Sequence, residues 1–262
     1  MKHRCKEQRY KVLPECKELP DEVWESILER LVLNDNYNHF KLPSLVCKQF
    51  LSITNRLRRK FVSKDCVLRT SWSNVLIRAL ERFRNLKEIG FSPWWWTLSD
   101  VDSPILKIAY SGLDLQSICL SCFPVSPSAD SFTRLGCTMS NIKVLRCTRF
   151  GLLRDPDLVH IADALPQLEE LDIQYPQNKF EPSEVRYPEL SNHMVTDAGI
   201  EAISLKLHGL RRINISGIKG CSDRSLVALL SNCVHLNEIQ CRLCHVTRRG
   251  ICSNATRIDI LF

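Results

Sequence analysis

The stretch that decides the fold is LPQLEELDI, residues 165–173, in the second half of the chain. With Leu168 as the anchor, apolar residues stand at offsets of −10, −7, −3, +3 and +5. The three upstream offsets follow the three-then-four step of one helical face. The two downstream offsets follow the two-residue step of one strand face. This stretch therefore predicts a helix, a turn and a short strand that share one apolar side.

The same offsets recur around five other anchors, and of the 36 positions they define only Gly112 is not apolar. The six anchors are Leu86, Leu115, Ile142, Leu168, Leu210 and Leu236. A single unit cannot bury its apolar side, but stacked units bury it against one another. We therefore expect an α/β solenoid of six helix-strand repeats. The residues at offset +3, which should stack in one row, are Ile89, Ile118, Leu145, Leu171, Ile213 and Ile239.

A seventh unit begins near the end of the sequence. Ile251, Ile258 and Leu261 fit offsets −10, −3 and 0, whereas Asn254 breaks the pattern at −7. On this spacing the chain ends where a seventh strand would begin. Because solenoids need a capping unit at each end, the last helix is either that cap or the sign of a truncated version of a longer protein.

A different pattern precedes the repeats. Residues 19–31, LPDEVWESILERL, predict a helix that begins at Pro20 and has Val23, Ile27 and Leu31 on one face. Residues 42–58, LPSLVCKQFLSITNRLR, predict a second helical stretch with Pro43 in its first turn. The two stretches indicate a small helical bundle.

The order LP…ILERL…LVCKQF resembles the F-box, most closely the version in plant F-box/leucine-rich-repeat proteins. The repeats resemble leucine-rich repeats, since their strands read L-x-x-L-x-L; the string TDAGIEAI at 196–203 resembles the cysteine-containing subtype. The resemblance implies an F-box domain over residues 17–61 and a leucine-rich-repeat domain over residues 72–262. The segment NDNYNHFKLP departs from the F-box pattern.

F-box proteins of this kind are substrate-recognition subunits of SCF-type ubiquitin ligases, which mark proteins for ubiquitin-dependent degradation. The resemblance implies docking to a Skp-family adaptor and, through it, to the cullin ligase core. Carried over position by position, the adaptor contacts are Leu19, Pro20, Ile27, Leu28, Leu45, Val46, Cys47, Lys48 and Phe50. The alternative is that Ile27, Leu31 and Leu45 close the core of the bundle itself.

The side chains at offsets +2 and +4 should line the concave face of the solenoid. There Arg146 would neighbour Asp172, and Arg212 would lie between Glu170 and Glu238. This mixture of charges argues against a nucleic-acid groove, which needs one sign of charge along a face. It suits a protein substrate, although the charges could also be surface ion pairs within the chain.

Two irregular segments follow strands and carry aromatic side chains. The aromatic residues are Trp94, Trp95 and Trp96 in the first segment and Tyr175, Phe180 and Tyr187 in the second. Trp is enriched at binding hot spots, and long loops inside a regular array are often functional. Both segments are candidate substrate contacts; the alternatives are that the Trp residues cap the first repeat and that the second segment is disordered.

Charge and targeting signals bound the remaining possibilities. The net charge of +7 is concentrated in residues 1–17 and 56–69, which a nucleic acid, a membrane surface, an acidic protein or solvent could face. No stretch has the roughly 18 apolar residues of a membrane span, and the basic N-terminus lacks the apolar run of a signal peptide. We expect a protein of the nucleus or cytoplasm with no membrane or nucleic-acid partner.

The 13 cysteines are interpreted as small buried hydrophobic residues, because their number is odd and no secretory signal is present. Cys119 with Cys122 and Cys241 with Cys244 have C-x-x-C spacing, but repeats so far apart could not share a metal ion. No phosphate-binding glycine loop, HExxH or nucleophile elbow occurs. We therefore expect no catalytic residue, cofactor or metal site; a thiol or metal enzyme is set aside. The alternative to a ligase receptor is a non-ligase interaction scaffold or truncated paralogue.

Overall fold

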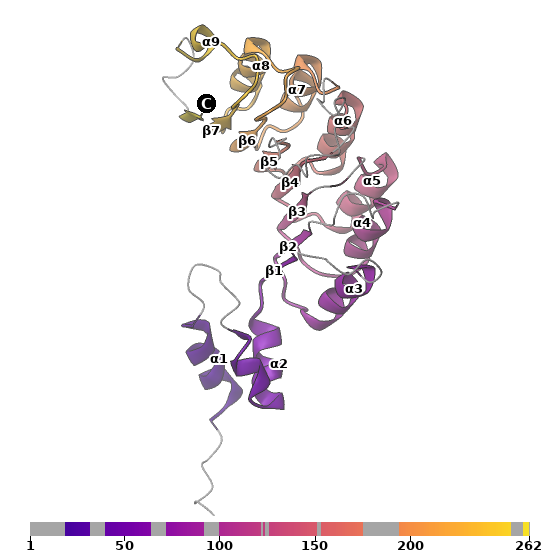
Figure 1. The fold of residues 1–262 in the computed structure, drawn as a ribbon, viewed down its shortest axis with the longest axis vertical. Helices are drawn as coiled ribbons and strands as arrows, with labels where there is room; N and C mark the ends of the chain where they lie inside the picture. Colours follow the sequence, from indigo (N-terminus) through magenta and orange to yellow (C-terminus); the bar gives the residue numbers. More distant parts are fainter. Residues whose placement is uncertain are drawn as a thin grey trace, which may run out of the picture. The chain divides into compact units, whose positions relative to one another are not determined.

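The computed structural model describes the chain in nine stretches, which form two compact units, Met1–Leu57 and Arg58–Phe262 (Figure 1). The described residues are 19–31, 40–63, 72–91, 100–121, 123, 126–150, 153–174, 194–252 and 259–261. Within them, no helix has the length and apolar character needed to cross a membrane.

The N-terminal unit consists of helix α1 (Asp21–Glu29), the short 3-10 helix η2 (Pro43–Leu45) and helix α2 (Lys48–Leu57). Helix α1 begins directly after Pro20, with Asp21 and Glu22 in its first turn, where acidic groups favour the helix dipole. The buried core of this unit is small, and Trp24 packs against it. Its buried members are Leu28, Phe40, Ile53 and Leu57.

Polar contacts join α1 to α2 within this unit. The Arg56 guanidinium donates to Asp21 at 2.7 Å and to Glu25 at 2.6 Å, and the Gln49 side chain donates to Asp21 at 2.9 Å. These groups are exposed enough that solvent screens them, so the apolar core contributes more to the stability of the unit.

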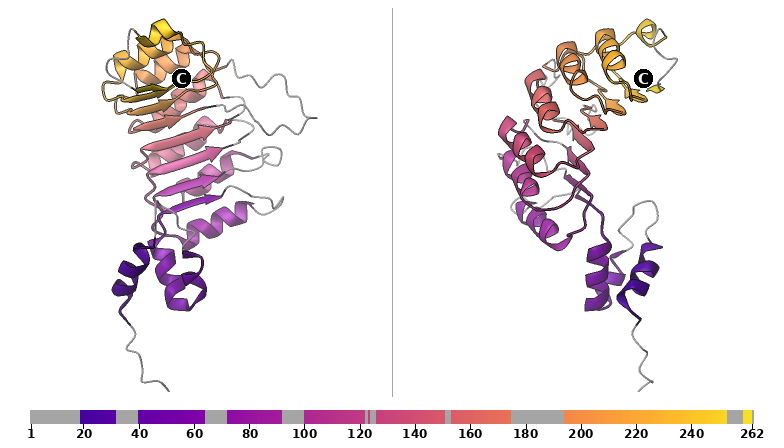
Figure 2. Two further views of the ribbon diagram at one scale, coloured as in Figure 1. Left: turned by 60° about the vertical axis from the view of Figure 1, so that its left-hand side comes forward. Right: turned by 180° about the vertical axis from the view of Figure 1, so that it is seen from behind.

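The second unit is a layer of helices on one face of an eight-stranded parallel sheet, in which the strands follow chain order from β1 to β8 (Figure 2). The strands are β1 (Lys60–Ser63), β2 (Glu88–Phe91), β3 (Ser117–Ser121), β4 (Val144–Thr148), β5 (Glu170–Asp172), β6 (Arg212–Asn214), β7 (Glu238–Gln240) and β8 (Asp259–Leu261). The helices are α3 (Trp72–Arg82), α4 (Asp102–Ala109), α5 (Ala129–Thr138), α6 (Asp155–Ala164), α7 (Asp197–Ser204), α8 (Asp223–Asn232) and α9 (Arg248–Cys252).

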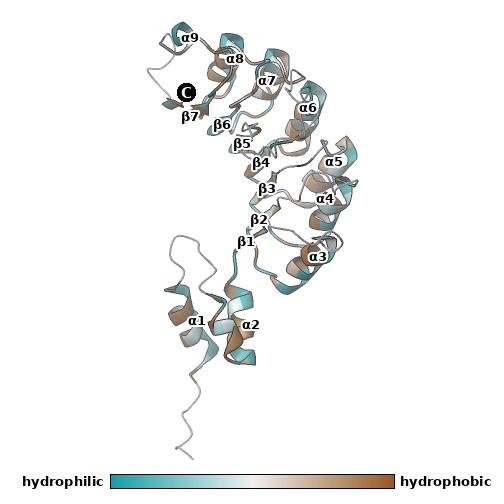
Figure 3. Ribbon diagram, viewed as in Figure 1, coloured by the Kyte–Doolittle hydropathy of each residue, from teal (hydrophilic) through white to brown (hydrophobic). Residues whose placement is uncertain are grey.

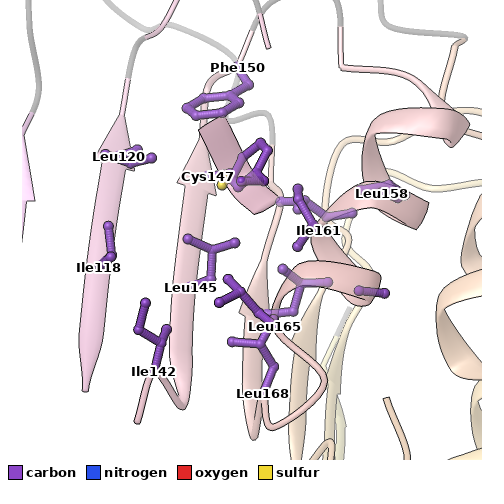
Figure 4. Close-up of a cluster of buried hydrophobic side chains, with 14 of the residues drawn as sticks. Ile118, Leu120, Ile142, Leu145, Cys147, Phe150, Leu158, Ile161, Leu165 and Leu168 are labelled. Carbon is purple, nitrogen blue, oxygen red and sulfur yellow. The ribbon is translucent and has the colours of Figure 1, made fainter. Parts of the chain in front are cut away.

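The repeat register predicted from the sequence is confirmed. Strands β2 to β7 begin two residues after the six anchors, and each +3 residue is the partner of the next along the sheet, from Ile89 with Ile118 to Ile213 with Ile239. Of the 36 apolar positions, 35 are buried. The exception is Gly112, which is exposed and has a φ of +67°; the next residue, Leu113, is buried instead. Figure 4 shows how the anchor and +3 side chains of neighbouring repeats meet the helix residues.

Two strands lie outside the six predicted repeats. Strand β1 pairs with β2 but comes after α2 and not after a repeat helix, so the helix-strand pattern did not reveal it. Its residues fall at the end of the range 17–61 that the sequence assigns to the N-terminal module, whereas the compact N-terminal unit ends at Leu57.

Strand β8 corrects the expectation that the chain ends before a seventh strand. Ile260 is the partner of Ile239 and so takes the +3 place that the spacing did not give it; Leu261 lies within the strand and not at an anchor. The physical reason is that α9 is shorter than the other repeat helices, so the last unit has fewer residues than the offsets assume.

A ladder of carboxylates joins the beginnings of successive helices, and the apolar pattern did not predict it. The first residue of α7, Asp197, accepts hydrogen bonds from the backbone and hydroxyl of Ser222 at 2.8 and 2.6 Å and of Ser225 at 3.1 and 2.5 Å. The first residues of three other helices have the same role. Asp102 accepts from Ser128 and Ser131, Asp155 from Thr196, and Asp223 from Thr247.

The ladder explains residue choices in the following repeat. A Cβ atom at Gly199 would collide with the Asp155 carboxylate, and one at Gly250 would collide with that of Asp223. Helix α5 begins with Ala129, which has no carboxylate, and the next helix, α6, is preceded by Arg154, where the helices that receive a ladder contact are preceded by Ser or Thr. The loss of the acceptor thus coincides with the loss of the hydroxyl that would have donated to it.

We predict that Asp197→Ala lowers the free energy of unfolding by about 2 kcal/mol, because it leaves the start of α8 without its acceptor. Asp130→Ala is the control: Asp130 also lies in the first turn of its helix, and its loss should cost under about 1 kcal/mol. Urea unfolding of both variants measures the difference. Equal losses would show that the ladder adds nothing beyond the helix dipole.

The effect of Asp197→Ala should depend on pH. Burial alone would raise the pKa of Asp197, but the hydrogen bonds from Ser222 and Ser225 outweigh it and hold the pKa below its usual value. A carboxyl with a lowered folded-state pKa stabilises the fold fully above its unfolded-state pKa and loses that contribution as the pH falls through the folded-state value. The difference in free energy of unfolding between Asp197→Ala and the unaltered protein should therefore become smaller as the pH falls.

Candidate functional site

The first candidate surface is an exposed apolar stripe on the N-terminal unit. Val23 and Ile27 lie one turn apart on the same side of α1, and Leu19 and Leu31 flank the two ends of the helix at the same spacing of four residues. Each is 41–44% exposed. These four residues, the α1 stripe, therefore do not close the core of their own unit. Figure 3 shows the apolar character of α1.

A second group of exposed apolar side chains lies at η2. Leu42, Leu45 and Val46 are 75, 76 and 69% exposed, respectively, and are called the η2 patch. Groups of exposed aliphatic residues on one small unit mark surfaces that another molecule covers. Leu42 was missed by the sequence reasoning, although it opens the same LPSLV string as Leu45.

The other expected adaptor contacts differ in exposure. Pro20, Cys47 and Lys48 are exposed, and Phe50 is half-buried, with its ring 4.6 Å from that of Trp24 in an edge-on arrangement. Leu28 is the exception to the prediction, because it is only 3% exposed and belongs to the core of the unit. It follows Ile27 directly on the helix and so points to a different side.

The second candidate surface is the face of the sheet that the helices leave bare. Because the helices form the outer layer of the second unit, this face is concave (Figure 2). Side chains at offsets +2 and +4 project from it, as predicted, and charged residues form an ion-paired line across it. The ion pairs are Lys60–Glu88 at 3.0 Å, Arg146–Glu88 at 4.0 Å, Arg146–Glu170 at 2.6 Å and Arg212–Glu170 at 2.6 Å.

Glu170 is the centre of this line. Its side chain is 13% exposed and accepts hydrogen bonds from both Arg146 and Arg212. Burial alone would raise the pKa of Glu170, but the two guanidinium groups outweigh it and hold the pKa below its usual value. Glu170 therefore stays ionised as the counter-ion of two arginines.

Asp172 lies beside Arg146 in the sheet, as expected, but does not form an ion pair with it. It is the strand partner of Arg146, but Arg146 forms its ion pairs with Glu88 and Glu170. The long Arg146 side chain reaches diagonally to Glu170, which strand register alone does not indicate. Burial raises the pKa of Asp172, against the hydrogen bond from the Gln174 backbone and the charge of Arg146.

These residues surround a hollow of about 300 Å³ on strands β5, β6 and β7. We call it the β5–β7 hollow. Its lining is Arg146, Glu170, Leu171, Asp172, Gln174, Arg212, Ile213, Asn214, Glu238 and Gln240. Glu238 is the strand partner of Arg212, as expected, and accepts a hydrogen bond from Gln240 at 2.7 Å. Gln174 lies one residue beyond the offsets, so sequence reasoning did not place it here.

The aromatic candidates Trp94, Trp95, Trp96, Tyr175, Phe180 and Tyr187 lie outside the described residues. Among the described cysteines, burial raises the pKa of the Cys241 thiol to about 11 and that of Cys221 to about 12. Both thiols are therefore protonated at neutral pH and are poor nucleophiles. Within the described stretches, no group of three His, Cys, Asp or Glu residues could hold a metal ion.

Comparison with known proteins bears on the repeat unit. No family model and no curated protein matches the chain. Among solved structures, the chain is similar to the leucine-rich-repeat-containing protein LegL7 from Legionella pneumophila, with a TM-score of 0.50 and 14% identity, over 80% of this chain and 64% of that one. The repeat unit has the leucine-rich-repeat fold.

Two further similarities are weaker. An internalin (inlF) from Listeria monocytogenes matches with a TM-score of 0.45 and 8% identity, over 82% of this chain and 50% of that one. A chain of the yeast Rad7–Elc1 complex matches with a TM-score of 0.38 and 14% identity, over 92% of this chain and 81% of that one. The chain thus spans half of the internalin and just under two thirds of LegL7.

We predict that Leu28→Ala lowers the stability of the N-terminal unit by about 2–4 kcal/mol, because it opens a cavity in a core of four residues. Ile27→Ala, at the neighbouring exposed position, should change it by under about 0.5 kcal/mol. Thermal unfolding of both variants, followed by fluorescence, measures the difference. Because the chain has five Trp residues, the signal of Trp24 is identified by replacing the Trp residues one at a time. Equal losses would place Ile27 in the core as well.

In the leucine-rich-repeat unit, Glu170→Gln should lower the free energy of unfolding by about 1–2 kcal/mol, since it leaves two arginines without their shared counter-ion. The neighbouring Glu169→Gln is the matched control. Glu169 also pairs with two cations, Lys143 at 2.7 Å and Arg211 at 3.4 Å, but its side chain is 34% exposed. Exposed pairs contribute little, so this variant should lose under about 0.5 kcal/mol in urea unfolding. A larger loss from Glu169→Gln would contradict the prediction.

Proposed function

We propose that this chain is the substrate-recognition subunit of an SCF-type ubiquitin ligase. The N-terminal unit would bind a Skp-family adaptor, and the leucine-rich-repeat unit would hold a protein substrate on its concave face. The observation that carries the proposal is the α1 stripe, four aliphatic side chains that are 41–44% exposed in the stretch whose sequence resembles the F-box.

Covering the α1 stripe with a partner would be favourable, because it removes apolar surface from water. Each aliphatic side chain that is removed from water contributes roughly 25 cal/mol per Å² of apolar surface. Among its described residues, the N-terminal unit has four buried core residues and so has little apolar area of its own to bury. An apolar groove on an adaptor would cover the stripe by the recognition mode in which a helix lays its apolar face into a groove. The η2 patch offers a second apolar contact.

The concave face supports a protein substrate. Its charges alternate in sign along the sheet, from Lys60 and Glu88 to Arg212 and Glu238. A nucleic-acid groove would instead need positive charge along its whole length. The contribution of the chain would be proximity: it raises the effective concentration of the substrate near a conjugating enzyme held by the cullin core, whose catalytic cysteine belongs to another subunit. The compartment would be the nucleus or cytoplasm.

A non-ligase interaction scaffold is the alternative. Reconstitution with adaptor, cullin core and conjugating enzyme separates the two functions. Transfer of ubiquitin to a protein that co-purifies with the chain is expected for the ligase receptor, and adaptor binding without transfer would favour the scaffold.

The adaptor contact is tested by Ile27→Lys. The variant should lose capture of a purified Skp-family adaptor by at least about 100-fold, because a charge in an apolar interface leaves an ion without water or a partner. Val227→Lys is the control: Val227 is 53% exposed on α8 in the other unit, and its replacement should leave capture unchanged.

Folding of both variants is checked by their unfolding curves. A folded Ile27→Lys protein that still captures the adaptor would contradict the expected loss at this position. The double variant Leu19→Lys with Ile27→Lys covers the case in which one charge is tolerated at the edge of the interface. Adaptor capture by a folded double variant would rule out the ligase function on this basis.

A further inference from the structure

The β5–β7 hollow contains the carboxylate of Asp172, whose hydrogen bonds come from a residue two positions further along the chain. Asp172 accepts hydrogen bonds from the Gln174 backbone at 3.1 Å and from the Gln174 side chain at 3.2 Å. Among the described residues, no cation lies within ion-pair distance of it. Carboxylates that are largely withdrawn from water are normally paired with a cation.

The two arginines of the hollow are committed elsewhere. Arg146 donates to Glu170 through Nε at 2.8 Å and through its terminal nitrogen at 2.6 Å. Arg212 donates to the other oxygen of the same carboxylate at 2.8 and 2.6 Å. Glu170 therefore holds both guanidinium groups, and the neighbouring Asp172 has no direct ion pair with either of them.

A buried amide in the hollow also has a free donor. Asn214 is 9% exposed, and its Oδ1 accepts from the Ser216 backbone at 3.0 Å. Its Nδ2 has no hydrogen-bond partner within the described part of the chain, although the residue lines the hollow. This nitrogen is therefore available, at the surface of the hollow, to donate to an acceptor that a bound segment brings.

The rim adds a second negative charge. Glu238 lies on β7, between its strand partners Arg212 and Asp259, and its described contact is the hydrogen bond from Gln240. The lining thus has two arginines, both bound to Glu170, and two further carboxylates. The described lining therefore has three carboxylates, those of Glu170, Asp172 and Glu238, against two guanidinium groups.

We propose that the β5–β7 hollow takes a lysine or arginine side chain of the bound protein segment, with Asp172 as its acceptor, Glu238 at its rim, and Asn214 Nδ2 donating to a carbonyl oxygen of that segment. The inference rests on the proposed function for the role of the concave face and names the chemistry that this face selects. The raised pKa of Asp172 agrees with it, since a carboxyl that lacks a cation is harder to ionise when buried.

The probe is a set of synthetic peptide pools, each about 12 residues long, which in extended form reach about 40 Å and so span the sheet. The pools share random flanks and differ in one fixed central residue: Lys, Arg, Gln or Glu. We expect the full chain to bind the Lys and Arg pools about 10-fold more tightly than the Gln and Glu pools. Equal binding, preference for Glu, or no capture of any pool would overturn the proposal.

Asp172→Asn tests the acceptor directly. The variant keeps an oxygen for the Gln174 backbone but removes the charge, so the preference for Lys and Arg should fall about 10-fold while the Gln pool is unaffected. Asp130→Asn, which removes one exposed charge from the helix side, should change nothing. If Asp172→Asn alters the unfolding curve, Glu238→Gln at the rim replaces it and should lower the preference about threefold. An unchanged preference in the folded variants would refute the assignment.

The peptide experiment and the adaptor experiment test the two proposals independently, so that one proposal can be refuted while the other is retained. Asp172→Asn should still capture the Skp-family adaptor, and Ile27→Lys should still prefer the Lys and Arg pools. Retention of the adaptor by the folded double variant Leu19→Lys with Ile27→Lys would remove the ligase role and leave the cation site standing. Equal binding of all pools by a chain that captures the adaptor would remove the cation site alone.

Discussion

Burial of one apolar row along the sheet is the constraint on which the structure of the repeat unit depends. The +3 side chains from Ile89 to Ile239 are each at most 2% exposed, and each is covered by the repeats on either side as well as by the helix layer. No repeat can bury its own row alone, so its stability is shared with its neighbours. The offsets are tightly kept for this reason, while the residues that face solvent vary freely.

The same constraint shapes the concave face. When the odd positions of a strand are fixed in the core, the even positions must project from the other side, and their order across the sheet is set by the register of the buried row. Lys60, Glu88, Glu170, Arg212 and Glu238 thus meet as strand neighbours or near neighbours. The resulting unequal pairing, with Glu170 holding two arginines and Asp172 none, depends on side-chain length and burial.

The burial of the apolar row and the pairing of side chains on the concave face differ in how far the sequence could predict them. Strands β2 to β7 and their register are set by the spacing of apolar residues, because burial acts on every repeat alike. Strands β1 and β8 are not, because one lacks a repeat helix before it and the other comes after a short helix. At the candidate sites, the exposure of Ile27 and the burial of Leu28 depend on how α1 meets Phe40 and α2, and the diagonal reach of Arg146 depends on competition between two carboxylates. Neither is contained in a one-dimensional pattern.

The carboxylate ladder gives the stack a direction. Each acceptor belongs to one repeat and its hydroxyl donor to the next, so a repeat inserted or deleted during evolution must match its predecessor at one end and its successor at the other. Helices α3, α5 and α9 begin with Trp72, Ala129 and Arg248 and offer no acceptor to a succeeding repeat. Exchange of whole repeats between related proteins would therefore be tolerated best at the junctions after α3 and α5, where no such match is required.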